Sequence, residues 1–103
     1  MNELLKTYHI NNNGVVTVTA ETAYLTELIV SVEDAGTGWT FAVRDKQTTP
    51  MHAVPTWTPT KGGLDLRDRD FRPGQPMLMQ GGIDIVTATG TPGVVDVWIW
   101  YVQ

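Results

Sequence analysis

The sequence predicts an all-β fold, a single antiparallel sandwich of two sheets and about eight strands over residues 1–103. Apolar and polar residues alternate with a period of two in most segments, which is typical of strands with one buried face. Turn-forming residues separate these segments at intervals of roughly 8–12 residues, a spacing found in sandwiches and barrels. No segment sustains the period of an amphipathic helix, so we expect little helix.

The first half of the chain contains four expected strands. They cover residues 5–10, 15–20, 23–33 and 39–44. Asparagines and a glycine at 11–14 tolerate positive φ and predict a turn, and residues 34–38 turn the chain before the fourth strand. In the third strand the period of two puts Tyr24 on the same face as Leu28, and it puts Leu25 and Ile29 on the opposite, outward face.

The second half is less regular. Residues 51–57 predict an edge strand or an irregular segment, because Pro55 and the prolines on either side of it cannot donate to a ladder. Residues 67–76 predict a loop, and the segment 64–71 is the best candidate for a short helical turn. The remaining short strands are expected at 64–66, 77–79, 83–89 and 94–102, the last two joined by a Gly-Thr-Pro-Gly turn.

The last expected strand, residues 94–102, leaves two registers open. In one register the odd-numbered residues from Val95 to Tyr101 face the core, and Trp98 and Trp100 lie outside as a candidate interface. In the other register both tryptophans lie in the core. Either way, one face of this strand carries more apolar surface than a solitary monomer usually exposes.

Composition excludes several classes of function. The chain has no cysteine, which excludes disulfides and thiolate chemistry. A net charge of −4 argues against a nucleic-acid partner. No apolar run approaches the roughly 20 residues that a membrane span needs, and the first residues do not read as a secretion signal.

No residue pattern points to catalysis, to a cofactor or to a metal site, so we expect no enzyme activity. His9 and His52 have no acidic residue at a metal-ligand spacing, and we expect ordinary strand histidines at both positions. Nucleophile elbows and phosphate-binding glycine-rich loops are also missing from the sequence.

Acidic and basic residues alternate in the segment after residue 64. The segment contains Asp65, Arg67, Asp68, Arg69, Asp70 and Arg72. The carboxylates offer oxygen ligands to Ca²⁺, but the arginines compete with a cation for them, so a solvated or salt-bridged loop is expected. These charges either pair within their own loop or pair between copies, with Arg69 of one copy meeting Asp68 of another.

Two segments resemble small β-sandwich proteins of tailed bacteriophages. Residues 34–45 resemble a strand, an Ala-Gly-Thr-Gly-Trp turn and a second strand in those proteins. Residues 82–97 resemble their closing hairpin, and the similarity in layout spans 15–102. Residues 47–76 resemble no part of them. The resemblance implies a jelly-roll-like sandwich, without catalytic residues, that decorates or cements a capsid or sits in another accessory part of the virion.

The sequence therefore leads to the hypothesis of a non-enzymatic virion protein that decorates or stabilises the capsid. Its expected partners are copies of itself, with a trimer favoured, and the major capsid protein or another virion protein. It is expected in the virion after assembly in the host cytoplasm. Aromatic anchors and a charged rim form the candidate interface: Trp98, Trp100, Trp57, Arg67, Arg69, Arg72, Asp68 and Asp70.

A carbohydrate-binding module is the alternative function, because jelly-roll sandwiches often bind glycans through stacked aromatic rings. Trp57, with Tyr24 or Trp39 nearby, is the candidate stacking platform. Packing in the core accounts for the same tryptophans more simply.

Overall fold

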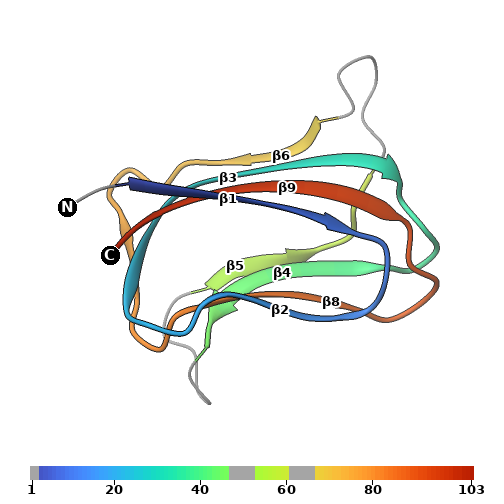
Figure 1. The fold of residues 1–103 in the computed structure, drawn as a ribbon. Helices are drawn as coiled ribbons and strands as arrows, with labels where there is room; N and C mark the ends of the chain where they lie inside the picture. Colours follow the sequence, from blue (N-terminus) through green and yellow to red (C-terminus); the bar gives the residue numbers. More distant parts are fainter. Residues whose placement is uncertain (1–2, 47–52, 61–66) are drawn as a thin grey trace.

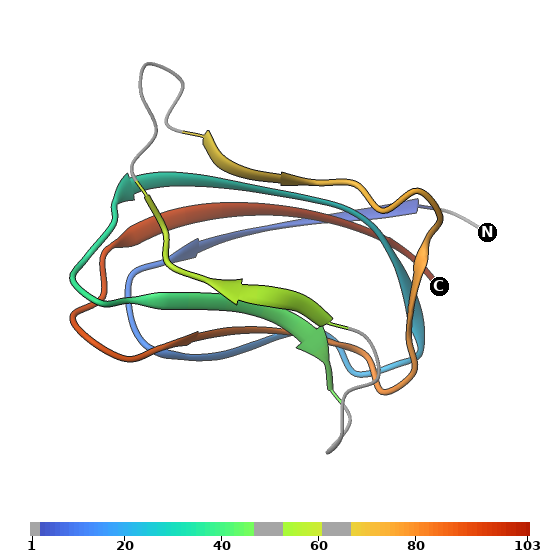
Figure 2. The same cartoon turned by 180° about the vertical axis from the view of Figure 1, so that it is seen from behind.

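The structure, a computed structural model, describes residues 3–46, 53–60 and 67–103, with the backbone alone at 53–57 and 67–70. In these ranges nine strands form two antiparallel sheets that face each other (Figures 1 and 2). The strands are β1 (Glu3–Ile10), β2 (Gly14–Thr19), β3 (Ala23–Asp34), β4 (Thr40–Asp45), β5 (Ala53–Trp57), β6 (Arg67–Phe71), β7 (Met77–Met79), β8 (Ile83–Ala88) and β9 (Val94–Val102).

The strand order is that of a jelly roll. The five-stranded sheet has the order β1-β9-β3-β6, with β7 also paired to β3, and the four-stranded sheet has the order β2-β8-β4-β5. The chain alternates between the sheets from β1 to β4 and again from β7 to β9, which gives the two nested Greek keys of this fold. The predicted sandwich is therefore confirmed.

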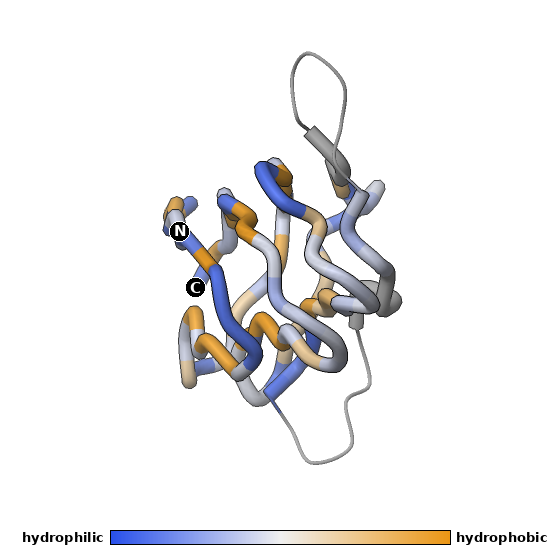
Figure 3. The backbone as a smooth tube through the Cα atoms, turned by 90° about the vertical axis from the view of Figure 1, so that its right-hand side faces the viewer, coloured by the Kyte–Doolittle hydropathy of each residue, from blue (hydrophilic) through white to orange (hydrophobic). Residues whose placement is uncertain are grey.

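The core lies between the two sheets. Apolar and polar residues alternate along the strands of both layers (Figure 3). Trp39, Phe41 and Val43 on the β4 side are fully buried, as the period of two predicts, and they belong to one apolar cluster with residues of β3 and β9. The other buried apolar residues are Ile10, Val18, Ala23, Leu25, Leu28, Val30, Val32, Met79, Ile83, Ile85, Val95, Val97, Ile99 and Tyr101.

The predicted faces of β3 are wrong at its beginning. Leu25 is completely buried, whereas Tyr24 points outward and is 40% exposed. The pairing of β3 with β9 shifts between Leu25 and Glu27, so Thr26 is an extra residue in the ladder. Such a β-bulge reverses which residues face the core, because successive side chains in a strand point to opposite faces. After the bulge the core face continues from Leu28, as predicted.

The predicted closing hairpin is also wrong. β8 and β9 do not pair, because they belong to different sheets, and the segment 89–93 carries the chain from one sheet to the other. This segment pairs instead with the β3–β4 connection. The Thr37 amide donates to the Thr91 carbonyl over 3.0 Å, and the Thr91 amide donates to the Thr37 carbonyl over 2.8 Å. The two sheet-crossing loops thus hold each other at one end of the sandwich.

Glycines allow these two loops to approach so closely. A Cβ atom on Gly93 would lie 1.9 Å from the Asp34 carbonyl oxygen, and one on Gly90 would lie 2.0 Å from that of Thr37. Both distances are far inside van der Waals contact, so a side chain at either position would push backbone against backbone.

β6 is a strand where a loop was predicted. Its charged sequence lacks an apolar–polar alternation, yet its backbone pairs with β3, with Phe71 opposite Leu28 and Asp70 opposite Ile29. Ladder hydrogen bonds use backbone groups, so this edge strand forms without the usual side-chain pattern. The helical turn expected at 64–71 is wrong over the residues of β6, and 64–66 lie outside the described residues. β5 lies at a sheet edge, as its proline predicts.

A Gly93→Ala variant is expected to lose more than about 2 kcal/mol of unfolding free energy, because the two loops must separate to admit the methyl group. Gly74→Ala is the matched control, since a Cβ there meets nothing within 4 Å. Its unfolding free energy should change by less than about 1 kcal/mol. Urea unfolding measures both, and equal midpoints would contradict the role given to the loop contact.

Candidate interaction surface

The last strand, β9, resolves the two registers that the sequence left open. Val95, Val97 and Ile99 are fully buried between the sheets, whereas Trp98 and Trp100 alternate with them and are half-buried on the other side. Both tryptophans therefore lie on the outer face of the five-stranded sheet, one of the two predicted registers.

Strand pairing gathers further apolar residues around the tryptophans. Trp100 lies opposite Leu5 of β1, and Trp98 lies opposite Ile29 of β3. We call the following set the outer face: Leu5, Tyr24, Ile29, Leu78, Trp98, Trp100 and Val102. Side chains of directly paired residues project to the same side of a sheet, so the set is continuous across four strands.

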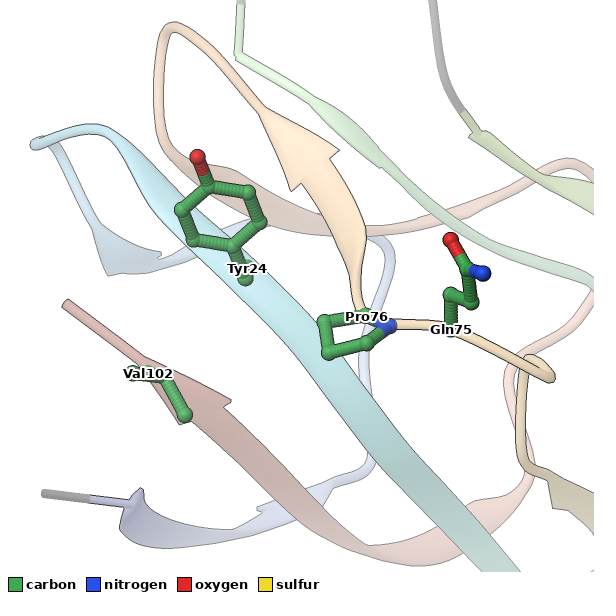
Figure 4. Close-up of a pocket in the computed structure, with 4 residues that line it drawn as sticks. All are labelled: Tyr24, Gln75, Pro76 and Val102. Atoms are coloured by element: carbon green, nitrogen blue, oxygen red, sulfur yellow. The ribbon is translucent and has the colours of Figure 1, made fainter. Parts of the chain in front are cut away.

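A shallow pocket of about 300 Å³ lies at one end of the outer face. Tyr24 of β3 and Val102 of β9 line it from the sheet, and Gln75 and Pro76 line it from the segment before β7 (Figure 4). Its lining is mostly apolar, with the Tyr24 hydroxyl and the Gln75 amide as polar groups. This composition suits an aliphatic or aromatic group of a partner, or one face of a sugar ring.

A second hollow of about 420 Å³, with a mixed polar and apolar lining, lies at the other end. There His9 Nδ1 is 2.7 Å from Asp96 Oδ1, across the β1–β9 pair, and Thr7 and Trp98 lie beside them. Both members of the pair are solvent-accessible, so the interaction contributes little to stability. The sequence did not reveal this partner of His9, because 87 positions separate the two residues.

The structure places one predicted rim residue, Arg72, against Glu27 of β3, which lies opposite Trp100. Arg72 Nε lies 2.8 Å from Glu27 Oε1, so this arginine pairs with a carboxylate of β3 and not only with its own loop. Arg67, Asp68, Arg69 and Asp70 belong to β6, and their side chains lie outside what the structure describes.

The predicted sugar-stacking platform is not assembled. Trp39 is completely buried, and its indole N–H donates to Asn13 Oδ1 over 2.8 Å. Trp57 belongs to β5 in the four-stranded sheet, whereas Tyr24 belongs to the other sheet. The same separation removes Trp57 from the surface that Trp98 and Trp100 share. Trp57 therefore belongs to a different layer from the two tryptophans of β9, and its part in an interface stays a prediction.

Buried acidic groups have structural partners. Asp45 accepts hydrogen bonds from the backbone amides of Gln80 and Gly81, each over 2.8 Å, and Asp84 accepts one from the Thr17 hydroxyl over 2.8 Å. Over the described ranges, no buried side-chain nitrogen or oxygen lacks a hydrogen-bond partner. No group of three or more potential metal ligands occurs among those residues either. His52 and Asp65 lie outside them.

Comparisons with protein-family models, with curated proteins and with solved structures found no match. In the described part of the chain no helix is long and apolar enough to cross a membrane.

The tryptophans are expected to differ in their contribution to folding. Trp39→Ala should lower the unfolding free energy by about 3–5 kcal/mol, because it empties a fully buried site and leaves Asn13 without its indole donor. Trp98→Ala should cost only about 1 kcal/mol, since it removes cross-strand contacts from a half-exposed position. Urea unfolding of the two variants checks this order, and similar losses would contradict the outward placement of Trp98.

Proposed function

We propose that this domain is a non-enzymatic structural protein that decorates or stabilises a bacteriophage capsid and attaches to the shell through its outer face. The observation that carries the proposal is the outward register of β9, which presents Trp98 and Trp100 beside Leu5 and Ile29 on one side of a sheet. Tryptophan and tyrosine are enriched in the cores of protein interfaces, where each ring buries a large area at small entropic cost.

Polar groups around the aromatic centre support a protein partner. The Arg72–Glu27 pair lies beside Trp100, because Glu27 is directly opposite Trp100 on β3, and the His9–Asp96 pair lies at one end of the outer face. The Thr26 hydroxyl donates to Glu3 Oε2 over 2.6 Å at the end near the termini. An apolar centre within a polar rim is the usual anatomy of a specific interface. Charges at the rim orient the partner, and the buried aromatics supply most of the binding free energy.

The assignment to a virion rests on sequence resemblance together with the fold. Residues 34–45 keep the strand, turn and strand order of the phage proteins that they resemble, although the strands on either side of the turn lie in different sheets. The jelly roll is frequent among viral capsid and lectin domains, so the fold is compatible with the virion role and does not by itself select it.

Removal of Trp98 is expected to weaken attachment to the shell. In co-sedimentation with capsid shells of the encoding phage, Trp98→Ala should reduce affinity by about 30-fold or more, the loss for an interface residue worth about 2 kcal/mol. Val15→Ala is the control, because Val15 is 56% exposed but lies on β2 of the opposite sheet. Equal shell binding by both variants would contradict attachment through the outer face.

The carbohydrate-binding alternative is favoured by one observation, the pocket beside Tyr24. A glycan panel monitored by intrinsic tryptophan fluorescence tests it, because Trp98 and Trp100 share the outer face with this pocket. A saturable change that Tyr24→Ala abolishes, combined with no binding to shells, would replace the capsid role by glycan recognition.

A further inference from the structure

We propose that the free edge of β1 pairs with β1 of a second copy, so that the five-stranded sheets of two molecules join into one continuous sheet. This inference names a surface for the self-association that is expected from the sequence, and it goes beyond the proposed attachment to the shell. It concerns a sheet edge, whereas attachment to the shell uses the outer face.

β1 is a long and regular edge strand. Its eight residues pair with β9 in unbroken register from Glu3 opposite Val102 to Ile10 opposite Val95. No described strand pairs with the other side of β1. A row of backbone N–H and C=O groups therefore faces away from the sheet, and such a row is a template for one more strand.

The other sheet edges carry features that discourage pairing. β2 has a register shift between Thr17 and Thr19, and β5 contains Pro55, which cannot donate a backbone hydrogen bond. The pairing of β6 with β3 shifts between Val30 and Ser31. β7, which pairs only with β3, has just three residues. Bulges, prolines and very short strands are devices by which proteins protect sheet edges, and among the described edge strands β1 alone has none of them.

Exposed apolar side chains accompany this edge. Leu4 is 41% exposed and Leu5 is 50% exposed, and they project to opposite faces of β1. A strand added beside β1 would cover both side chains at once, because each leucine gains a cross-strand neighbour on its own face. The two exposed leucines thus lie on the same strand as the unpaired backbone groups.

Lys6 does not block the edge. An inward-pointing charge on an edge strand usually opposes pairing. Here, however, Lys6 Nζ donates to the Val18 carbonyl of β2 over 2.6 Å and lies 5.9 Å from the centre of the Tyr101 ring. The ammonium group is therefore bonded to β2 of its own molecule, although Lys6 as a whole is exposed. Burial raises the pKa of the neighbouring Tyr8, and the Lys6 charge opposes this increase.

A second copy of the chain is the occupant that fits this edge. Antiparallel pairing of two identical strands follows a two-fold axis, which gives a closed and self-complementary contact. It brings the acidic end of β1, at Glu3, towards the His9 end of the other strand, whereas parallel pairing would put Glu3 beside Glu3. The expected product is a dimer, in place of the trimer that is favoured from the sequence.

Light scattering across a dilution series measures this association. The wild-type mass should rise with concentration towards twice the 11.4 kDa of one chain. Hydrogen exchange, which needs no variant, should show at least about tenfold slower exchange for β1 amides in the concentrated sample, because they acquire hydrogen bonds. A monomer at every concentration, or a dimer with unchanged β1 exchange, would overturn the proposal.

Variants separate the edge from the outer face. Leu4→Lys should keep the protein monomeric, since it places a charge beside the new strand, and Val15→Lys should associate like the wild type. If Trp98→Ala abolished the dimer and Leu4→Lys did not, self-association would belong to the outer face and the edge proposal would fail. Shell binding of Leu4→Lys tests the proposed function separately, because that function requires Trp98 and not an open β1 edge.

Discussion

The strict alternation of β9 is the constraint on which most of this structure depends. β9 pairs with β1 on one side and β3 on the other, so it lies in the middle of the five-stranded sheet. Its odd-numbered residues from Val95 to Tyr101 complete the core, and the period of two then forces Trp98 and Trp100 outward. The apolar outer face is thus a consequence of the way in which the core is filled.

The connections between the sheets impose a second constraint. Six of the strand-to-strand connections cross from one layer to the other, and the loop at Thr37 is hydrogen-bonded to the loop at Thr91. Gly90 and Gly93 make this contact possible because they lack a Cβ atom. Near the opposite end, the buried Asp45 carboxylate holds the amides of residues 80 and 81. Both ends of the sandwich are therefore held by polar contacts, and the apolar core lies between them.

The five-stranded sheet offers two surfaces with different chemistry. Its outer face presents side chains, with the Arg72–Glu27 pair beside Trp100 and the His9–Asp96 pair at one end. The β1 edge presents backbone groups, which recognise another strand and little else. A molecule that uses the edge for a second copy keeps its outer face accessible, so pairing and attachment to a larger assembly are compatible. Two linked outer faces would also bind a repetitive lattice more strongly than one.

By itself, the sequence determined the all-β class, most strand positions and the core face of β4, because period-two alternation is a local property of the chain. It narrowed β9 to two registers. The tertiary structure decided between these registers. A bulge in β3 exchanged the faces on which Tyr24 and Leu25 lie, and pairing with β3 made the charged segment 67–71 a strand. The tertiary structure also brought His9 to Asp96. Bulges, strand partners and contacts between distant residues depend on how two strands pair. A local sequence pattern does not encode this pairing.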